Sequence, residues 1–305
     1  MEKKAVVGRF APTPSGRMHL GNVFAALIAW ASVRSRNGGM VLRMEDLDTQ
    51  RTSADFASVL RDDLRWLGLD WDLEPEPQSQ RSAVYDRYFE KMMDEGLLYP
   101  CYCTRSQLHS VNAPHLSDGT YVYPGTCRNL QNPPAGRKPS WRVMVPDKVW
   151  SFTDRVQGDY SLNLATDCGD MVVRRADGVY VYQLAVTVDD GEAGVTEVVR
   201  GMDLLSSGPR QMYLQELLGF SHPEYGHVPM LLAPDGRRLS KRDKDLDLGE
   251  LRKHLAPEAL IGNLAAAAGL IDRYEKISAG ELAKEFSWEK LSGDSIYLDA
   301  ENLKG

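Results

Sequence analysis

The residues with the clearest chemical potential lie in the stretch VVGRFAPTPSGRMHLGN, residues 6–22. Gly16 and Gly21 remove side chains, so that a flat base or a phosphate can approach the backbone. His19 and Asn22 place hydrogen-bond donors at the start of a predicted helix, whose free backbone N–H groups also attract phosphate. The stretch has two interpretations: a nucleotide-phosphate site, or a surface turn leading into an ordinary helix with a chance histidine.

A second candidate is the basic segment GRRLSKRDK at 236–244. Lys241 lies between Ser240 and Arg242 on a predicted turn, from which it could reach the same phosphates as His19. From composition alone the segment is better interpreted as a solvated basic surface. The net charge of the chain is −7, which does not indicate a nucleic-acid partner, although local basic patches occur on acidic proteins.

Cysteine spacing indicates a metal site. Four cysteines are too few for a disulfide scaffold in a chain of 305 residues, and three of them, Cys101, Cys103 and Cys127, lie within a short segment. Three thiolates are suited to a tetrahedral structural zinc ion. Cys168 is interpreted as an ordinary residue, and the alternative for the other three is a group of buried free thiols. The candidates for a fourth ligand are His109, His115, Tyr121 and Tyr123, and general zinc chemistry favours a histidine.

The overall composition is that of a globular protein, with 43% hydrophobic and 26% charged residues. No apolar run approaches the roughly 18 residues of a membrane span, and the N-terminus has no signal-peptide pattern. We therefore expect a cytoplasmic protein without a membrane partner.

Alternating patterns predict the elements that position these residues. Strands are predicted at 5–10 and 40–47, and helices at 20–39, 53–72 and 81–98, with Ser53 as an N-cap. Strand–helix alternation is typical of a doubly wound parallel sheet. The pattern stops in a segment rich in Pro, Gly, Ser and Cys, which contains short strand candidates such as WRVMV. It resumes with VYVYQLAVTVDD, followed by VTEVVRG and by a helix with Pro209 in its first turn.

These patterns divide the chain into four parts. The predicted division is a first catalytic half at 1–98, an insertion at 99–178, a second catalytic half at 179–245 and a helical module at 246–305.

Two short motifs, in this order, resemble those of the class I aminoacyl-tRNA synthetases. HLGN at 19–22 is similar to their HIGH motif, and RLSKR at 238–242 is similar to KMSKS. Asn22 replaces a histidine and keeps a hydrogen-bond donor, while Arg238 replaces a lysine and keeps the charge. The resemblance implies a Rossmann-type α/β catalytic domain with an insertion that carries zinc and a small helical C-terminal module.

Within this class the chain resembles the glutamyl branch over essentially its whole length. The similar segments are RFAPTPSGRMHLGN, LRMEDLDTQR, YQLAVTVDD, VVRGMDLL and FSWEKL…DAENL. Thr13 stands where serine is commoner and keeps the hydroxyl. The resemblance also favours Tyr123 as the fourth zinc ligand, because the branch has a tyrosine four residues before the last cysteine.

The resemblance implies roles for individual residues. Arg9 and Arg200 address carboxylate, Glu45 addresses the amino group, and Tyr182 lines the pocket. Arg9 and Glu45 are predicted to end the first two strands, where both can face one cleft; the alternative for Glu45 is a salt bridge to a neighbour such as Arg51. The expected L-glutamate site comprises Arg9, Phe10, Ala11, Pro12, Thr13, Glu45, Tyr182 and Arg200.

The expected ATP site comprises Gly16, His19, Gly21, Asn22, Ser240 and Lys241, with Mg²⁺ held mostly by ATP and water. His19, Asn22 and Lys241 are the candidates for stabilising the transition state of phosphoryl transfer.

Several activities fit this resemblance. The favoured one activates glutamate without RNA and transfers it to the queuosine of tRNA(Asp), and the protein is expected to be a monomer. A synthetase that charges the tRNA 3′ end is the nearest alternative; the short segment after Arg242 argues against the helical anticodon-binding region of that enzyme. Two less favoured activities are those of an RNA-independent adenylating enzyme and of a non-catalytic regulator that binds RNA or zinc.

Overall fold

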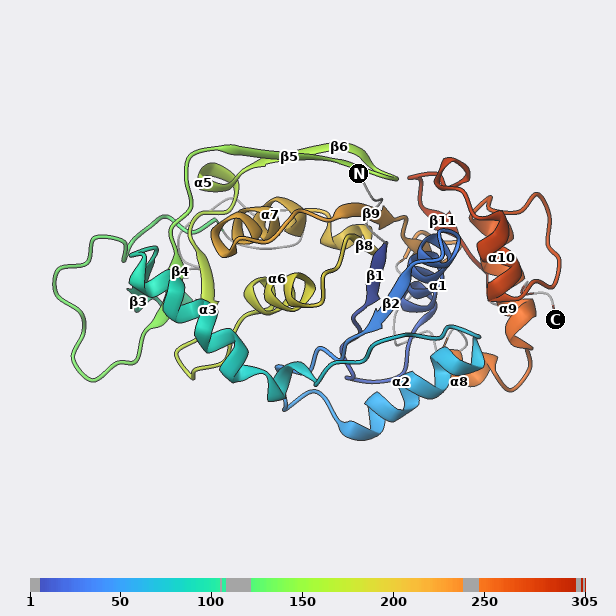
Figure 1. Ribbon diagram of the computed structural model, residues 1–305, viewed down its shortest axis with the longest axis horizontal. Helices are drawn as coiled ribbons and strands as arrows, with labels where there is room; N and C mark the ends of the chain where they lie inside the picture. Colours follow the sequence, from blue (N-terminus) through green and yellow to red (C-terminus); the bar gives the residue numbers. More distant parts are fainter. Residues whose placement is uncertain (1–5, 105, 108–121, 238–246, 300–302, 304) are drawn as a thin grey trace.

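A four-stranded parallel sheet lies at the centre of the protein, in the spatial order β2-β1-β8-β9 (Figure 1). The computed structural model describes residues 6–104, 106–107, 122–237, 247–299, 303 and 305. Every pairing within this sheet is parallel, which confirms the predicted α/β architecture. The strands are β1 (Val7–Phe10), β2 (Gly39–Leu42), β8 (Glu197–Gly201) and β9 (Glu224–Val228).

Helices cover both faces of this sheet. The helix between β1 and β2, α1 (Leu20–Arg34), packs on one face and against α10 (Ala279–Glu285), so it is apolar nearly all round. On the other side lie α6 (Tyr182–Glu192) and α7 (Ser207–Leu218), which pack against each other (Figure 1). The helix predicted at 20–39 is shorter in the structure, where it ends at Arg34.

Two amphipathic helices follow β2: α2 (Ala54–Trp66) and α3 (Ser82–Asp94), with the 3₁₀ turn η1 (Gln78–Gln80) between them. Ser53 is the N-cap of α2, as predicted, and its hydroxyl accepts a hydrogen bond from the backbone N–H of Phe56.

The predicted strand at 40–47 ends at Leu42, so Glu45 lies beyond the end of β2 rather than within it. The backbone still follows the turn after β1, because Arg43 N–H donates to the Phe10 carbonyl and Glu45 N–H to the Pro12 carbonyl. Proline has no N–H to return such a bond, so the ladder stops there while the two segments stay adjacent.

Between α3 and α6 the chain forms two antiparallel structures. One is a sheet of β3 (Leu98–Cys101), β4 (Ser140–Val143) and β7 (Met171–Arg174), in which β4 is the predicted strand WRVMV. The other is a hairpin of β5 (Val149–Asp154) and β6 (Gly158–Asn163), followed by the short helix α5 (Leu164–Asp167). The hairpin lies along β9, an edge strand, and Arg155 N–H donates to the Tyr225 carbonyl.

The C-terminal part packs back onto the first half of the chain. It contains α8 (Leu248–Leu251), α9 (Pro257–Ala267), α10 and the turn η4 (Trp288–Lys290), while β11 (Ile296–Tyr297) pairs with β10 (Leu231–Leu232). The buried Asp63 of α2 accepts hydrogen bonds from Arg252 after α8 and from Arg17 in the turn after β1. None of the described helices is long and apolar enough to cross a membrane.

Candidate active site

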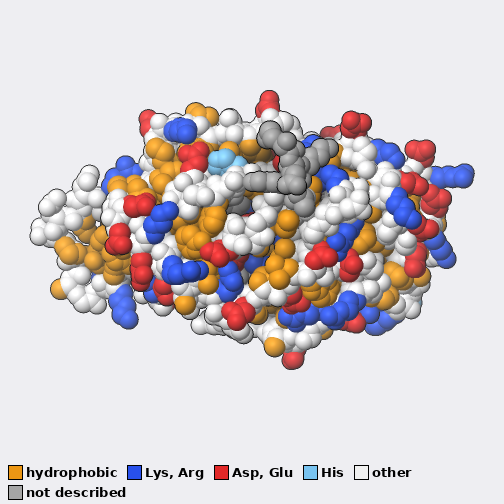
Figure 2. Space-filling model, viewed as in Figure 1, with side chains coloured by type: hydrophobic (Ala, Val, Ile, Leu, Met, Phe, Trp, Pro, Cys, Tyr) orange, Lys and Arg blue, Asp and Glu red, His pale blue; other side chains and the backbone are white. Residues whose placement is uncertain are grey.

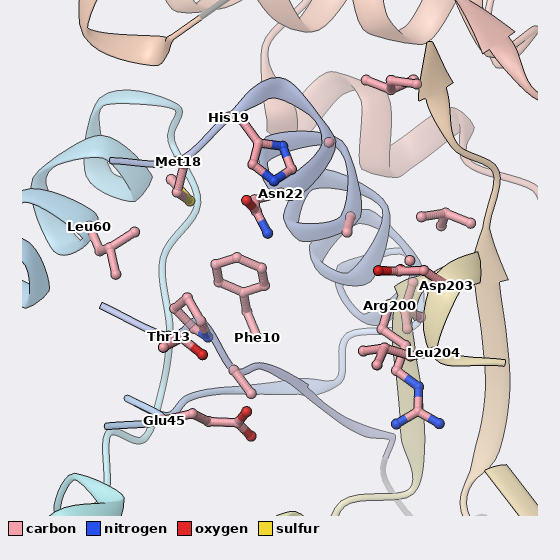
Figure 3. Close-up of a pocket in the computed structure, with 18 of the residues that line it drawn as sticks. Phe10, Thr13, Met18, His19, Asn22, Glu45, Leu60, Arg200, Asp203 and Leu204 are labelled. Carbon is pink, nitrogen blue, oxygen red and sulfur yellow. The ribbon is translucent and has the colours of Figure 1, made fainter. Parts of the chain in front are cut away.

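A cavity of about 590 Å³ opens where β1 and β8 end and α1 begins. Its volume is typical of sites for small molecules and cofactors. Of the predicted glutamate and ATP residues, twelve line it: Arg9, Phe10, Ala11, Pro12, Thr13, Gly16, His19, Gly21, Asn22, Glu45, Tyr182 and Arg200. Figure 3 shows His19 and Asn22 at one end of the pocket, Glu45 and the Arg200 guanidinium at the other, and Phe10 between them. The other two predicted residues, Ser240 and Lys241, lie outside the described residues.

The end of the cavity near α1 has the features of a phosphate site. His19 is the N-cap of α1 in an extended conformation, and its side chain makes no capping hydrogen bond. The first turn of α1 contains no acidic residue, so no side chain of that turn offsets the positive end of the helix dipole. A Cβ on Gly21 would lie 3.0 Å from the His19 ring, so a larger residue here would require the imidazole to shift slightly.

The opposite end is built from two buried arginines. Arg9 is 4% exposed; its Nη1 donates to the Val199 carbonyl, and its Nε lies 3.6 Å from an Asp190 carboxylate oxygen. Burial, together with the charges of Arg43 and Arg200, lowers the pKa of Arg9. Burial therefore makes the charged form of Arg9 less favourable, and an anionic ligand in the cavity would offset this unfavourable free energy.

Arg200 is 5% exposed and makes no ion pair with any described carboxylate. Its Nε donates to His227 Nε2 at 2.9 Å and its Nη1 to Gln211 Oε1 at 2.8 Å. Its Nη2 is buried without a hydrogen-bond partner among the described residues. A buried guanidinium nitrogen left unpaired is costly, and a carboxylate bound in the cavity would satisfy it.

Glu45 pairs with Arg43, not with the Arg51 that was the predicted alternative. Arg43 Nη2 donates to Glu45 Oε1 at 3.1 Å, and Arg43 Nη1 donates to Asp190 at 2.6 Å. Burial raises the pKa of Glu45 in spite of this neighbour. Glu45 thus lines the cavity and is held there by Arg43.

Sequence reasoning did not assign the buried network behind the cavity. Arg43 is almost fully buried and bridges Glu45 to Asp189 and Asp190 of α6. Asp189 also accepts hydrogen bonds from Gln78, Arg81 and Tyr85. The only sequence signal was the presence of charged residues within apolar patterns, in RMED and VTVDD.

The three predicted zinc-ligand cysteines lie together beside β3, with their sulfur atoms within 4.8 Å of one another. Cys103 Sγ lies 3.6 Å from Cys127 Sγ, and the Tyr123 hydroxyl lies 3.4 Å from Cys101 Sγ and 3.8 Å from Cys103 Sγ. A tetrahedral ion with Zn–S bonds of about 2.3 Å separates its sulfurs by about 3.8 Å. The four side chains therefore fit one zinc ion. His109, His115 and Tyr121 lie outside the described residues.

Two neighbouring residues hold the Tyr123 side chain in place. Cys127 N–H donates to the Tyr123 hydroxyl at 2.9 Å, and the Arg142 guanidinium lies 3.6 Å from the centre of the Tyr123 ring. Burial raises the pKa of the Cys103 thiol to about 11, a penalty that binding to a cation would reverse.

Comparison with known proteins identifies the class to which the chain and its fold belong. Residues 5–304 match the family model described as tRNA synthetases class I (E and Q), catalytic domain. The crystal structure of the glutamate-tRNA synthetase from Elizabethkingia anophelis superposes with a TM-score of 0.84 at 28% identity, covering 98% of this chain and 69% of that one.

Two curated relatives are more similar in sequence. The glutamyl-Q tRNA(Asp) synthetase of Symbiobacterium thermophilum is 43% identical, over 97% of each chain. The protein with the same name in Nitratidesulfovibrio vulgaris is 45% identical, over 87% of this chain and 86% of its own. The chain therefore belongs to the class I tRNA synthetases of the glutamate and glutamine type and, within them, to the glutamyl-Q tRNA(Asp) synthetase family.

Proposed function

We propose that this protein activates L-glutamate with ATP and transfers the glutamyl group to the queuosine of tRNA(Asp). The observation that carries the proposal is the pairing, in one cavity, of a helix N-terminus without an acidic residue in its first turn and two buried arginines. Each of these arginines has a guanidinium nitrogen without a hydrogen-bond partner among the described residues. Glutamate supplies two carboxylates and ATP supplies the phosphates. The acceptor follows from the names of the curated relatives.

In the proposed activation step a glutamate carboxylate oxygen attacks the α-phosphorus of ATP in line, and pyrophosphate leaves. Arg9 and Arg200 hold carboxylate, and Glu45 holds the ammonium group. His19, Asn22 and Lys241 stabilise the charge on the pentavalent phosphorus, and Mg²⁺ travels with the ATP phosphates. No covalent bond to the enzyme forms, so catalysis rests on positioning and charge.

In the transfer step a hydroxyl of the queuosine cyclopentenediol attacks the carbonyl carbon of the glutamyl-adenylate, and AMP leaves. On the face drawn in Figure 2, basic and acidic side chains are interspersed. With a net charge of −7 over the whole chain, we expect RNA contacts to be local and made by the insertion and the basic segment 236–244.

Because the glutamate and ATP residues all lie in the catalytic core, we expect activation without RNA. Purified protein with glutamate, ATP and magnesium should exchange labelled pyrophosphate into ATP without tRNA. The Lys241→Ala variant should lower the exchange rate and leave the KM for glutamate nearly unchanged. Exchange that appears only when tRNA is added would instead favour a synthetase that charges the 3′ end.

We also propose a structural zinc ion bound by Cys101, Cys103, Tyr123 and Cys127. Metal analysis of the purified protein should give about one zinc per chain, as for a four-ligand structural site. Tyr123→Phe should lower zinc retention in the presence of a chelator, whereas His115→Ala should not. If Tyr123→Phe keeps all its zinc and His115→Ala loses it, His115 and not Tyr123 would be the fourth ligand.

A further inference from the structure

Behind Arg200 lies a buried row of three side chains from distant segments. Arg200 on β8 donates through Nε to His227 Nε2 at 2.9 Å, and His227 Nδ1 lies 2.6 Å from Asp154 Oδ2. The side chains of His227, on β9, and of Asp154, at the end of β5, are both 0% exposed. The row thus connects the hairpin to the arginine that lines the cavity.

The chemistry of arginine fixes the direction of these hydrogen bonds. A guanidinium can only donate, so the His227 Nε2 facing it must be the nitrogen without a proton. Nδ1 therefore carries the proton and donates it to Asp154. Burial, together with the charge of Arg200, lowers the pKa of His227 to about 4, in spite of Asp154, so the ring is neutral near neutral pH.

The row balances the charge of Arg200 without occupying the side that faces the cavity. Asp154 stays ionised: although it is buried, hydrogen bonds from the His227 ring and from backbone N–H groups lower its pKa. Its negative charge is separated from Arg200 by the imidazole, whereas a direct carboxylate partner would compete with the substrate for the guanidinium. His227 and Gln211 bind Nε and Nη1, and Nη2 is left for a ligand.

We propose that Asp154 and His227 are positioning residues, which set the orientation of the Arg200 guanidinium for the substrate carboxylate. This proposal rests on the proposed function in one respect, which is that the substrate carboxylate belongs to glutamate. It assigns to the β5–β6 hairpin a part in amino-acid recognition, in addition to covering the β9 edge.

The contacts of Asp154 make a single-atom test possible. Its Oδ1 accepts three backbone hydrogen bonds at 3.0 Å, from Val156, Gln157 and His227, and the His227 N–H is shared with Oδ2 at 3.1 Å. In Asp154→Asn these three N–H groups hold the amide oxygen in the Oδ1 position, and the NH₂ group must face His227 Nδ1. The ring then takes the opposite tautomer, and its Nε2–H points at the Arg200 Nε–H.

We expect Asp154→Asn to raise the KM for glutamate at least tenfold in pyrophosphate exchange, with an unchanged KM for ATP. The melting temperature should fall, because two N–H groups then face each other in a buried site, but the protein should stay folded at the assay temperature. Nitrogen-15 NMR of the free protein should show the His227 tautomer change from Nδ1–H to Nε2–H. His227→Gln, whose side-chain oxygen can accept from Arg200, should keep more glutamate affinity than His227→Leu. Asp159→Asn is the matched control on the same hairpin, where the exposed carboxylate accepts from Thr153, and it should behave as wild type.

Two results would overturn the proposal: a wild-type KM for glutamate in Asp154→Asn, or a raised KM without the tautomer change, which would indicate general loosening. Failure of the proposed function is distinguishable, because the wild type would then show no glutamate-dependent exchange. The tautomer measurement still decides whether the row exists, since it needs no substrate.

Discussion

Arg200→Leu is expected to lower kcat/KM for glutamate-dependent pyrophosphate exchange by about 100-fold or more. Removing one partner of a buried, hydrogen-bonded charge pair typically costs about 2–5 kcal/mol, which corresponds to roughly 30- to several-thousand-fold. A 100-fold loss corresponds to about 2.8 kcal/mol and lies within this range. We expect at least this loss, because Arg200 is nearly fully buried and its Nη2 has no other partner among the described residues.

Two further variants separate charge from geometry at this position. Arg200→Lys keeps a positive charge but lacks the planar group that contacts His227 and Gln211, so it should recover only a small part of the activity. Arg87→Ala removes an exposed arginine on α3 and should have no effect. The melting temperature of each variant distinguishes lost binding from unfolding. Near-normal exchange in a folded Arg200→Leu protein would remove Arg200 from the glutamate site.

The elements that position the site were largely predictable from local patterns. The helix with its Ser53 cap, the parallel strands and the turn before α1 each depend on residues close together in sequence, and the structure confirms them. The twelve cavity-lining residues were named from a turn whose chemistry suggested phosphate and from a family resemblance. Their contact in one cavity is observed, and their individual roles remain predictions.

The charged networks behind the cavity were not predictable, because their partners are far apart along the chain. Arg43 meets Asp190 across 147 positions, and His227 meets Asp154 across 73. Charged residues within an apolar pattern indicate that a charge is buried, but one sequence does not show which distant residue pairs with it. The Glu45 pair has a different explanation. Arg43 is only two positions from Glu45, and the turn after β2, which the sequence pattern did not predict, decides which neighbouring arginine Glu45 meets.

The acceptor is the second prediction with a large expected effect. Queuosine carries a cyclopentenediol whose hydroxyls can attack the glutamyl-adenylate, and the unmodified base lacks this ring. Transfer to tRNA(Asp) without queuosine should therefore be absent rather than reduced. Because the proposed contacts of segment 236–244 are to phosphates, transfer to the modified tRNA should also weaken as salt rises, while tRNA-independent exchange should not.

The central claim is tested most directly by locating the glutamate that the protein attaches to RNA. Labelled glutamate is incubated with ATP, the protein and tRNA(Asp) from cells that make queuosine or cannot make it, and the labelled product is mapped with nucleases. We predict label only on the queuosine-containing tRNA, in the anticodon loop. Label at the 3′-terminal adenosine, or equal labelling of the two tRNAs, would contradict this assignment.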